Sequence, residues 1–129
     1  MSRYRDTGLL LLRLGIGLMF VLHGWPKVAG GYDKWVAVGG AMRHLGITLL
    51  PAAWGLAAAL SETLGGLLLA LGFGFRIACI FLAVTMAVAT LMHLRQGDGL
   101  PGASHALESC ILFLSLILIG PGKYSLGRG

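Results

Sequence analysis

Four long apolar segments alternate with short polar connections along the chain. They run from about Gly8 to Gly24, Pro51 to Leu71, Ile77 to Leu94 and Ser104 to Gly120. Each has about 17–21 residues, which at a 1.5 Å rise per residue suits a hydrocarbon core of about 30 Å. Backbone amides find no water inside lipid, so segments of this length predict helices. The pattern therefore predicts an all-α integral membrane protein, a four-transmembrane-helix bundle forming a single domain over residues 1–129.

The connection between the first two segments predicts a short interfacial helix over about residues 33–45. Asp33 stands where a helix cap is expected. An apolar stripe opposes a basic face, as in helices that lie in the head-group plane. The stripe consists of Trp35, Val38, Met42 and Leu45, and the basic face of Lys34, Arg43 and His44. The other connections are a tight hairpin at Gly72–Arg76 and a glycine-rich loop over 97–102.

Composition supports lipid as the main solvent of the chain. Hydrophobic residues make up 57% of the 129 residues and charged residues only 12%, whereas soluble domains carry about 25% charged residues. The net charge of +5 comes from basic residues scattered singly at segment ends. That distribution is typical of head-group anchoring and argues against nucleic-acid binding.

The basic residues also give an expected orientation. Four crossings place both termini and the Gly72–Arg76 hairpin on one side, with five basic residues against four on the other. The small excess predicts cytoplasmic termini. The two basic sets are Arg3, Arg5, Arg76, Lys123 and Arg128, and Lys27, Lys34, Arg43 and Arg95.

The first apolar segment is expected to be a retained helix. A charge at Arg13, inside this segment, favours a retained helix over a signal peptide.

Several polar residues fall inside or at the ends of the apolar segments. A charge near the bilayer centre costs at least about 2.5–3.5 kcal/mol on insertion scales, so such groups should face the bundle interior. Counting rise per residue places Arg13 at ~8 Å from the inner boundary, Glu62 at ~15 Å and Glu108 at ~18 Å. His23 and His105 fall at ~22 Å, His93 at ~25 Å and Lys27 at ~28 Å. We expect Arg13 to meet Glu62, the two glutamates to share a layer, and His23 and His93 to stand above them in one outward-opening cavity.

Structural roles compete with this functional interpretation. Arg13 and Glu62 could form an ion pair that only fixes helix order, and Glu108 could be protonated and bonded to a carbonyl or hydroxyl. His23 and His93 could anchor helix ends at the head groups, and we assign His105 to a helix cap or head-group contact.

Metal and disulfide chemistry receive little support. Di-iron bundles use Glu-x-x-His pairs, which do not occur here, and haem would need two axial histidines at one depth. We expect no metal, and we expect Cys79 and Cys110 to be buried, inert thiols at different depths without a disulfide. Small residues that let helices approach closely favour a homodimer or tight packing within the bundle. They are Gly15, Gly17, Gly65, Gly66 and Gly72.

The order of these motifs resembles the DoxX family of small four-helix bacterial membrane proteins. The resemblance rests on Arg13, His23-Gly24-x-x-Lys27, Glu62-x-x-Gly65-Gly66, Gly72 to Arg76, His93, Glu108 and Gly120-Pro121-Gly122-x-x-Ser125-Leu126. Family members often continue with an aspartate where Gly127 stands here. The resemblance implies a bacterial cytoplasmic-membrane protein. Relatives include a subunit of thiosulfate:quinone oxidoreductase and a membrane partner in thiol and oxidative-stress complexes.

We therefore expect a membrane subunit of a redox system that binds a quinone or similar amphiphile in an intramembrane polar pocket, alongside redox partner proteins. No flavin or nicotinamide motif and no activated nucleophile occurs, so the sequence assigns no self-sufficient catalysis. Two alternatives stay open: a non-catalytic transporter or carrier of a small molecule, and a structural assembly partner of a membrane complex. The candidates for ligand binding or proton relay are Arg13, His23, Lys27, Glu62, His93 and Glu108.

Overall fold

The computed structural model describes residues 3–127, so Arg128 of the charge comparison lies outside the described residues. Four of its helices are long and apolar enough to cross a membrane, which confirms the predicted all-α bundle. In chain order the elements are α1 (Arg3–Ala29), α2 (Tyr32–Gly39), the 3₁₀ helix η1 (Gly40–Leu45), α3 (Pro51–Leu71), α4 (Phe75–Arg95) and α5 (Gly99–Ile119).

Three helices, α1, α4 and α5, extend beyond their predicted bounds, and the extension of α5 includes a proline in its first turn. α1 continues past Gly24 and contains Pro26 close to its end. α5 begins at Gly99, so Pro101 falls in its first turn. The first amides of a helix have no intrahelical acceptor, and a proline there costs no hydrogen bond. The glycine-rich pattern over 97–102 predicts a loop here, whereas the structure has the first turn of α5.

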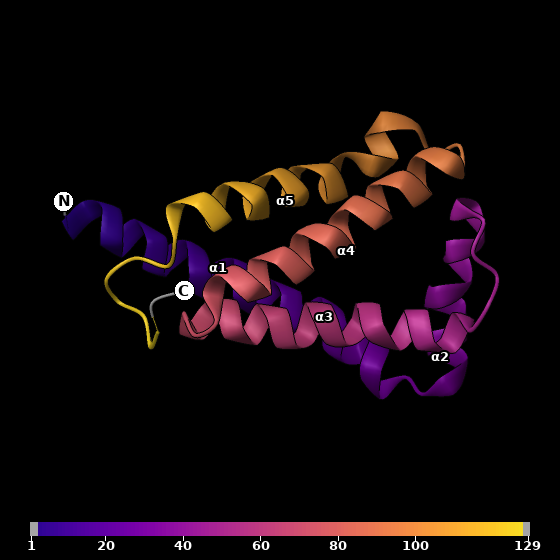
Figure 1. Cartoon of the computed structure of the whole chain (residues 1–129), viewed down its shortest axis with the longest axis horizontal. Helices are drawn as coiled ribbons and strands as arrows, with labels where there is room; N and C mark the ends of the chain where they lie inside the picture. Colours follow the sequence, from indigo (N-terminus) through magenta and orange to yellow (C-terminus); the bar gives the residue numbers. More distant parts are fainter. Residues whose placement is uncertain (1–2, 128–129) are drawn as a thin grey trace.

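The helices run alternately up and down the bundle (Figure 1). Both chain ends and the turn between α3 and α4 lie at one end of the molecule, on the left in Figure 1. α2, η1 and the turn between α4 and α5 lie at the opposite end. This is the relative placement that four crossings require.

α1 and α3 pack closely because glycines face each other. A Cβ atom added at Gly17 would lie 2.5 Å from the carbonyl oxygen of Gly66, and one at Gly66 would lie 2.6 Å from that of Gly17. Gly65 gives the same close approach to Leu82 of α4. The packing role predicted for these glycines is confirmed, but Gly15 faces open space and takes no part in it.

The segment between α1 and α3 crosses one end of the bundle as two short helices. α2 packs against the start of α3, where Gly39 directly approaches Pro51 and Gly55. Trp35 fixes the segment to α1 through a hydrogen bond from Nε1 to the carbonyl of Val28, at 3.1 Å. Gly39, which weakens a continuous α-helix here, is therefore the residue of this segment that permits the close packing on α3.

Asp33 does not cap α2 as predicted. The cap position is Gly31, with φ 83°, and no side chain caps the helix. α2 begins one residue before Asp33, which therefore lies in the first helical turn. A carboxylate there still interacts favourably with the positive end of the helix dipole.

The core lies where α1, α3, α4 and α5 meet. The rings of Phe20 and Phe113 meet edge to face at 5.1 Å and join α1 to α5. Cys79 is buried and Cys110 is half-buried, and both are free thiols. The thiol of Cys110 donates to the carbonyl of Ala83 at 3.5 Å, linking α5 to α4.

Candidate functional site

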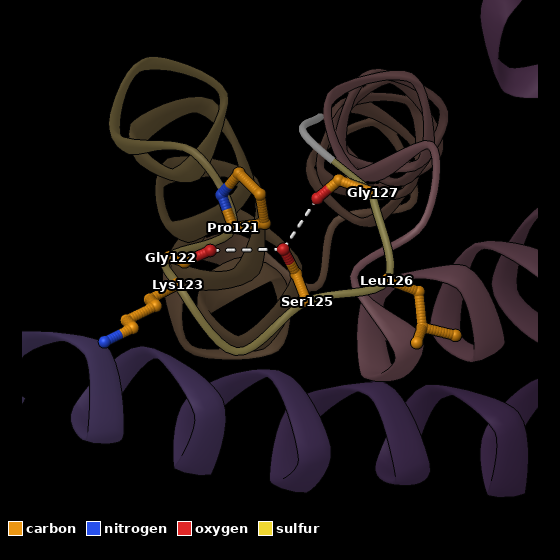
Figure 2. A pocket seen from close by; sticks show the side chains of 6 residues that line it. All are labelled: Pro121, Gly122, Lys123, Ser125, Leu126 and Gly127. Atoms are coloured by element: carbon orange, nitrogen blue, oxygen red, sulfur yellow. Dashed lines mark hydrogen bonds between the residues drawn. The ribbon is translucent and has the colours of Figure 1, made fainter.

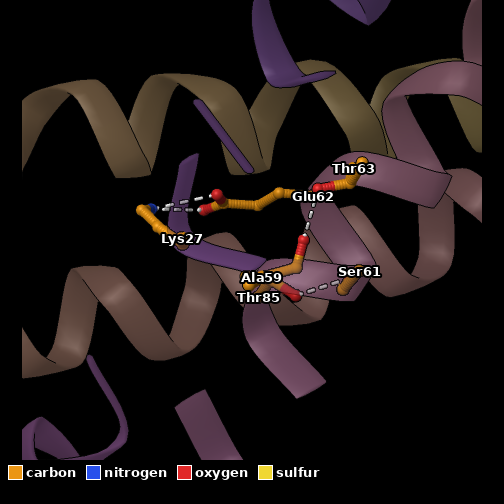
Figure 3. A network of polar contacts seen from close by, with 6 residues as sticks. All are labelled: Lys27, Ala59, Ser61, Glu62, Thr63 and Thr85. Atoms are coloured by element: carbon orange, nitrogen blue, oxygen red, sulfur yellow. Dashed lines mark hydrogen bonds and ion pairs between the residues drawn. The ribbon is translucent and has the colours of Figure 1, made fainter. Parts of the chain in front are cut away.

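Lys27 and Glu62 form an ion pair between the end of α1 and the middle of α3 (Figure 3). Lys27 Nζ lies 3.0 Å from Glu62 Oε2 and 3.3 Å from Oε1. The Glu62 side chain is 9% exposed and that of Lys27 32%. Gly24, one turn before Lys27, packs against Glu62 and Thr63 and sets the register of the two helices. The ammonium therefore compensates a carboxylate that would be costly to bury alone.

Arg13 does not pair with Glu62, so that prediction was wrong. Its side chain is 2% exposed, and its guanidinium donates to four backbone carbonyls. Two acceptors belong to the last turn of α3 and two to the segment after α5. They are Leu69 at 3.2 Å, Ala70 at 3.0 Å, Pro121 at 3.2 Å and Tyr124 at 2.6 Å.

The end of α3 explains why the guanidinium lies there. The last carbonyls of a helix lack intrahelical donors, and five N–H groups on one planar side chain can satisfy several of them. Glu62 lies about two turns, or ~10 Å, before Leu69 on α3. Gly72, with φ +72°, leaves room for the guanidinium, since a Cβ there would lie 2.9 Å from Arg13 Nη2.

The Gly120–Leu126 motif forms a C-terminal segment that closes this end of the bundle. Leu126 N donates to Leu71 O at 3.2 Å, and Gly127 N donates to Gly72 O at 3.1 Å. Ser125 Oγ bonds to the carbonyls of Gly122 and Gly127 across the pocket in Figure 2. These contacts give the motif a structural role at the end opposite to the Lys27–Glu62 pair.

His23 and His105 face each other from α1 and α5. Their ring centroids are 6.3 Å apart, with the ring planes at 62°, and both residues are exposed. His23 also meets the edge of the Phe20 ring, at 6.4 Å between centroids. Because His23 and Lys27 are four residues apart on one helix, the imidazole pair adjoins the ion pair.

Sequence reasoning missed the part played by His105. It assigned this residue to a cap or a head-group contact, although the depth estimates for His23 and His105 were both ~22 Å. The equal depth of the two histidines is the signal that could have paired them. Equal depth predicts a contact only when the two helices face each other, and this is what the structure adds.

His93 and Glu108 lie apart from this arrangement. His93 Nδ1 is 2.9 Å from Asp98 Oδ2, at the turn between α4 and α5. Glu108 is exposed near the middle of α5, and within residues 3–127 it has no hydrogen bond or ion pair. Glu62 and Glu108 are thus not brought together as expected. No group of three or more His, Cys, Asp or Glu residues within 3–127 could hold a metal ion.

Together these features define a small four-helix membrane protein with an ion pair and two facing imidazoles near the end of α1. The chain belongs to the DoxX family, whose model matches residues 8–95. This match ends with α4, so the α5 residues of the site lie beyond it.

Relatives align over nearly the whole chain. The chain is 30% identical to inner membrane protein YqjF of Escherichia coli K12, over 99% of this chain and 95% of the relative. It is 31% identical to inner membrane protein YphA of the same organism, over 98% and 96%. A protein of Haemophilus influenzae is 30% identical, over 98% and 92%. No solved structure matches the chain.

Proposed function

We propose that this protein is a membrane subunit of a redox system, and that it binds the head group of a quinone or similar amphiphile beside His23 and His105. We assign it to the bacterial inner membrane, as the names of YqjF and YphA state for those relatives. The small excess of basic residues favours cytoplasmic termini.

The facing imidazoles are the observation that carries this proposal. A quinone carbonyl accepts hydrogen bonds, and the hydroxyl of the reduced form donates them. Neutral imidazole offers one donor and one acceptor, so it can bind either form. His23 and His105 are both exposed, and their rings lie 6.3 Å apart across α1 and α5. An amphiphile could therefore place its head beside the pair and its tail along the apolar helix surfaces.

In this proposal, residues of this chain supply the protons for quinone reduction and a partner protein supplies the electrons. Reducing a quinone to a quinol takes two electrons and two protons. An imidazole can act as a general acid and deliver a proton to a quinone oxygen. Glu62 is a buried carboxyl held by Lys27, one turn from His23 on α1, and could pass protons to this imidazole. The electrons come from a redox partner protein, because the sequence carries no flavin or nicotinamide motif.

Quinone binding by the purified protein tests the proposal. A short-chain naphthoquinone is titrated into the protein in lipid nanodiscs, with quenching of tryptophan fluorescence as the readout. Trp25 lies two residues from His23 and serves as a local reporter. We expect saturable quenching, weakened about tenfold by His23→Phe or His105→Phe, the equivalent of about 1.4 kcal/mol.

The matched control is His93→Phe, which removes an imidazole that bonds instead to Asp98. It should leave the affinity unchanged. Linear quenching without saturation in the native protein, or equal affinity in all three variants, would refute the proposal.

A further inference from the structure

Glu108 presents a carboxyl group on an exposed face of α5. It lies near the middle of a helix that is long and apolar enough to cross a membrane. Within residues 3–127 it has no hydrogen-bonding or charged partner. A carboxylate facing acyl chains is costly, and intramembrane acids usually pair with another group. An exposed, unpaired acid in this position therefore calls for a partner outside the chain.

The neighbours of Glu108 form a stripe with the spacing of a helix-docking seam. Successive members are separated by four, three, four and three residues, which are the intervals of a and d positions in a heptad. Ile111 is 56% and Leu118 84% exposed, so the stripe is largely uncovered by the bundle. The Glu108 stripe consists of Ser104, Glu108, Ile111, Ser115 and Leu118.

The two serines of the stripe fit helix docking. Ser104 Oγ donates to Pro101 O at 3.0 Å, and Ser115 Oγ donates to Ile111 O at 2.8 Å. Their donors are therefore used within α5, while their oxygen lone pairs can still accept hydrogen bonds. Small residues also let a second helix approach closely. The stripe thus offers a carboxylate and two acceptors to a partner.

Within residues 3–127, no lysine or arginine forms a hydrogen bond or ion pair with this carboxylate. Arg13 is bonded to four carbonyls and Lys27 to Glu62. The other lysines and arginines of residues 3–127 lie at helix ends or in the connecting segments. A second copy docked symmetrically would bring Glu108 against Glu108, a repulsive pair of like charges.

We infer that the Glu108 stripe docks a transmembrane helix of another protein, one that carries a lysine or arginine near its middle. The basic side chain pairs with Glu108, and the small serines let the two helices pack in the left-handed geometry of a heptad seam. This surface does not depend on quinone binding at His23 and His105. It would join this chain to a membrane complex whether or not that site is occupied.

A synthetic helix tests the inference without knowledge of the natural partner. The probe is a leucine-rich transmembrane peptide with one central lysine, and the comparison is the same peptide with leucine in its place. Donor-labelled protein and acceptor-labelled peptide are reconstituted in phosphatidylcholine vesicles, and energy transfer is measured against peptide concentration. We expect saturable transfer to the lysine peptide and at least tenfold weaker association with the leucine peptide.

Three variants distinguish docking at the Glu108 stripe from a general attraction of the lysine peptide to any exposed carboxyl group. Glu108→Gln preserves size and should weaken association about tenfold, and Glu108→Leu should do the same. Glu108→Leu combined with Leu114→Glu moves the carboxyl to another exposed face and should not restore association. Full association in Glu108→Gln, or equal association after relocation, would overturn the inference. Transfer between two copies of the protein that is lost in Glu108→Gln would also overturn it, and would make the stripe an interface between copies.

Discussion

The Nζ atom of Lys27 lies 3.0 Å from Oε2 of Glu62, so an ion pair joins the last turn of α1 to the middle of α3. Lys27 lies one helical turn after His23 on α1, and its partner Glu62 belongs to the adjacent helix α3. Its carboxylate is almost fully buried and its ammonium is partly exposed. This geometry keeps the charged part of the site neutral overall and leaves the imidazoles accessible.

Breaking the Lys27–Glu62 pair at one end should cost more than removing both ends. Lys27→Met leaves a buried, uncompensated carboxylate and should lower the free energy of unfolding by about 1–3 kcal/mol, below the range for fully buried pairs because Lys27 is partly exposed. Lys27→Met with Glu62→Leu should recover most of this loss. Unfolding of the purified protein by SDS titration measures both. A double variant as unstable as Lys27→Met alone would contradict this account.

Arg13 and Glu62 should behave independently, because they contact different parts of the chain. Arg13→Leu removes four hydrogen bonds to backbone carbonyls and should destabilise the protein by several kcal/mol, at about 1 kcal/mol or more for each lost bond. In a double-mutant cycle with Glu62→Leu, the interaction energy should lie within about 0.5 kcal/mol of zero. Residues in direct contact have interaction energies of about 0.5–3 kcal/mol. A value of about 2 kcal/mol or more would therefore contradict the structure, because it would indicate a direct Arg13–Glu62 pair.

The C-terminal segment should stabilise the bundle in part through Arg13. Deleting residues 121–129 removes two of the four acceptors of the guanidinium, those of Pro121 and Tyr124. We expect lower stability and a smaller effect of Arg13→Leu in the shortened chain than in the full one. SDS unfolding of the four proteins measures this difference. Equal effects of Arg13→Leu in both backgrounds would mean that the segment is held by other contacts.

Gly15 and Gly17 provide a matched pair for testing the contact between α1 and α3. Gly17→Ala places a methyl group 2.5 Å from the carbonyl oxygen of Gly66 and should cost about 1–3 kcal/mol through overpacking. Gly15→Ala points into open space and should be neutral, or stabilising by about 0.5–1 kcal/mol through helix propensity. The order of the two stabilities is the readout. A reversed order would contradict the packing of α1 on α3.

The sequence predicted the four helices well because an apolar segment long enough to cross the hydrocarbon core can pair all its backbone amides internally only as a helix. It also predicted the close packing at Gly17, Gly65 and Gly66. It failed for Arg13, because the acceptors at the end of α3 and after α5 are backbone carbonyls, which leave no trace in side-chain patterns. Depth counted along each helix gives a residue's height in the bundle but not which helix faces meet. For this reason the sequence predicts a pair of Arg13 with Glu62 and does not pair His105 with His23.

Photolabelling tests the binding of an amphiphile at the imidazole pair most directly. A short-chain quinone bearing a photoreactive group is irradiated with the protein in nanodiscs, and the modified peptides are identified by mass spectrometry. We predict labelling of α1 around His23 and of α5 around His105, suppressed by excess unlabelled quinone and by the double variant His23→Phe/His105→Phe. Labelling confined to other surfaces, such as the apolar groove between α3 and α4 lined by Leu64, Leu68 and Phe81, or labelling that excess quinone does not suppress, would contradict the account.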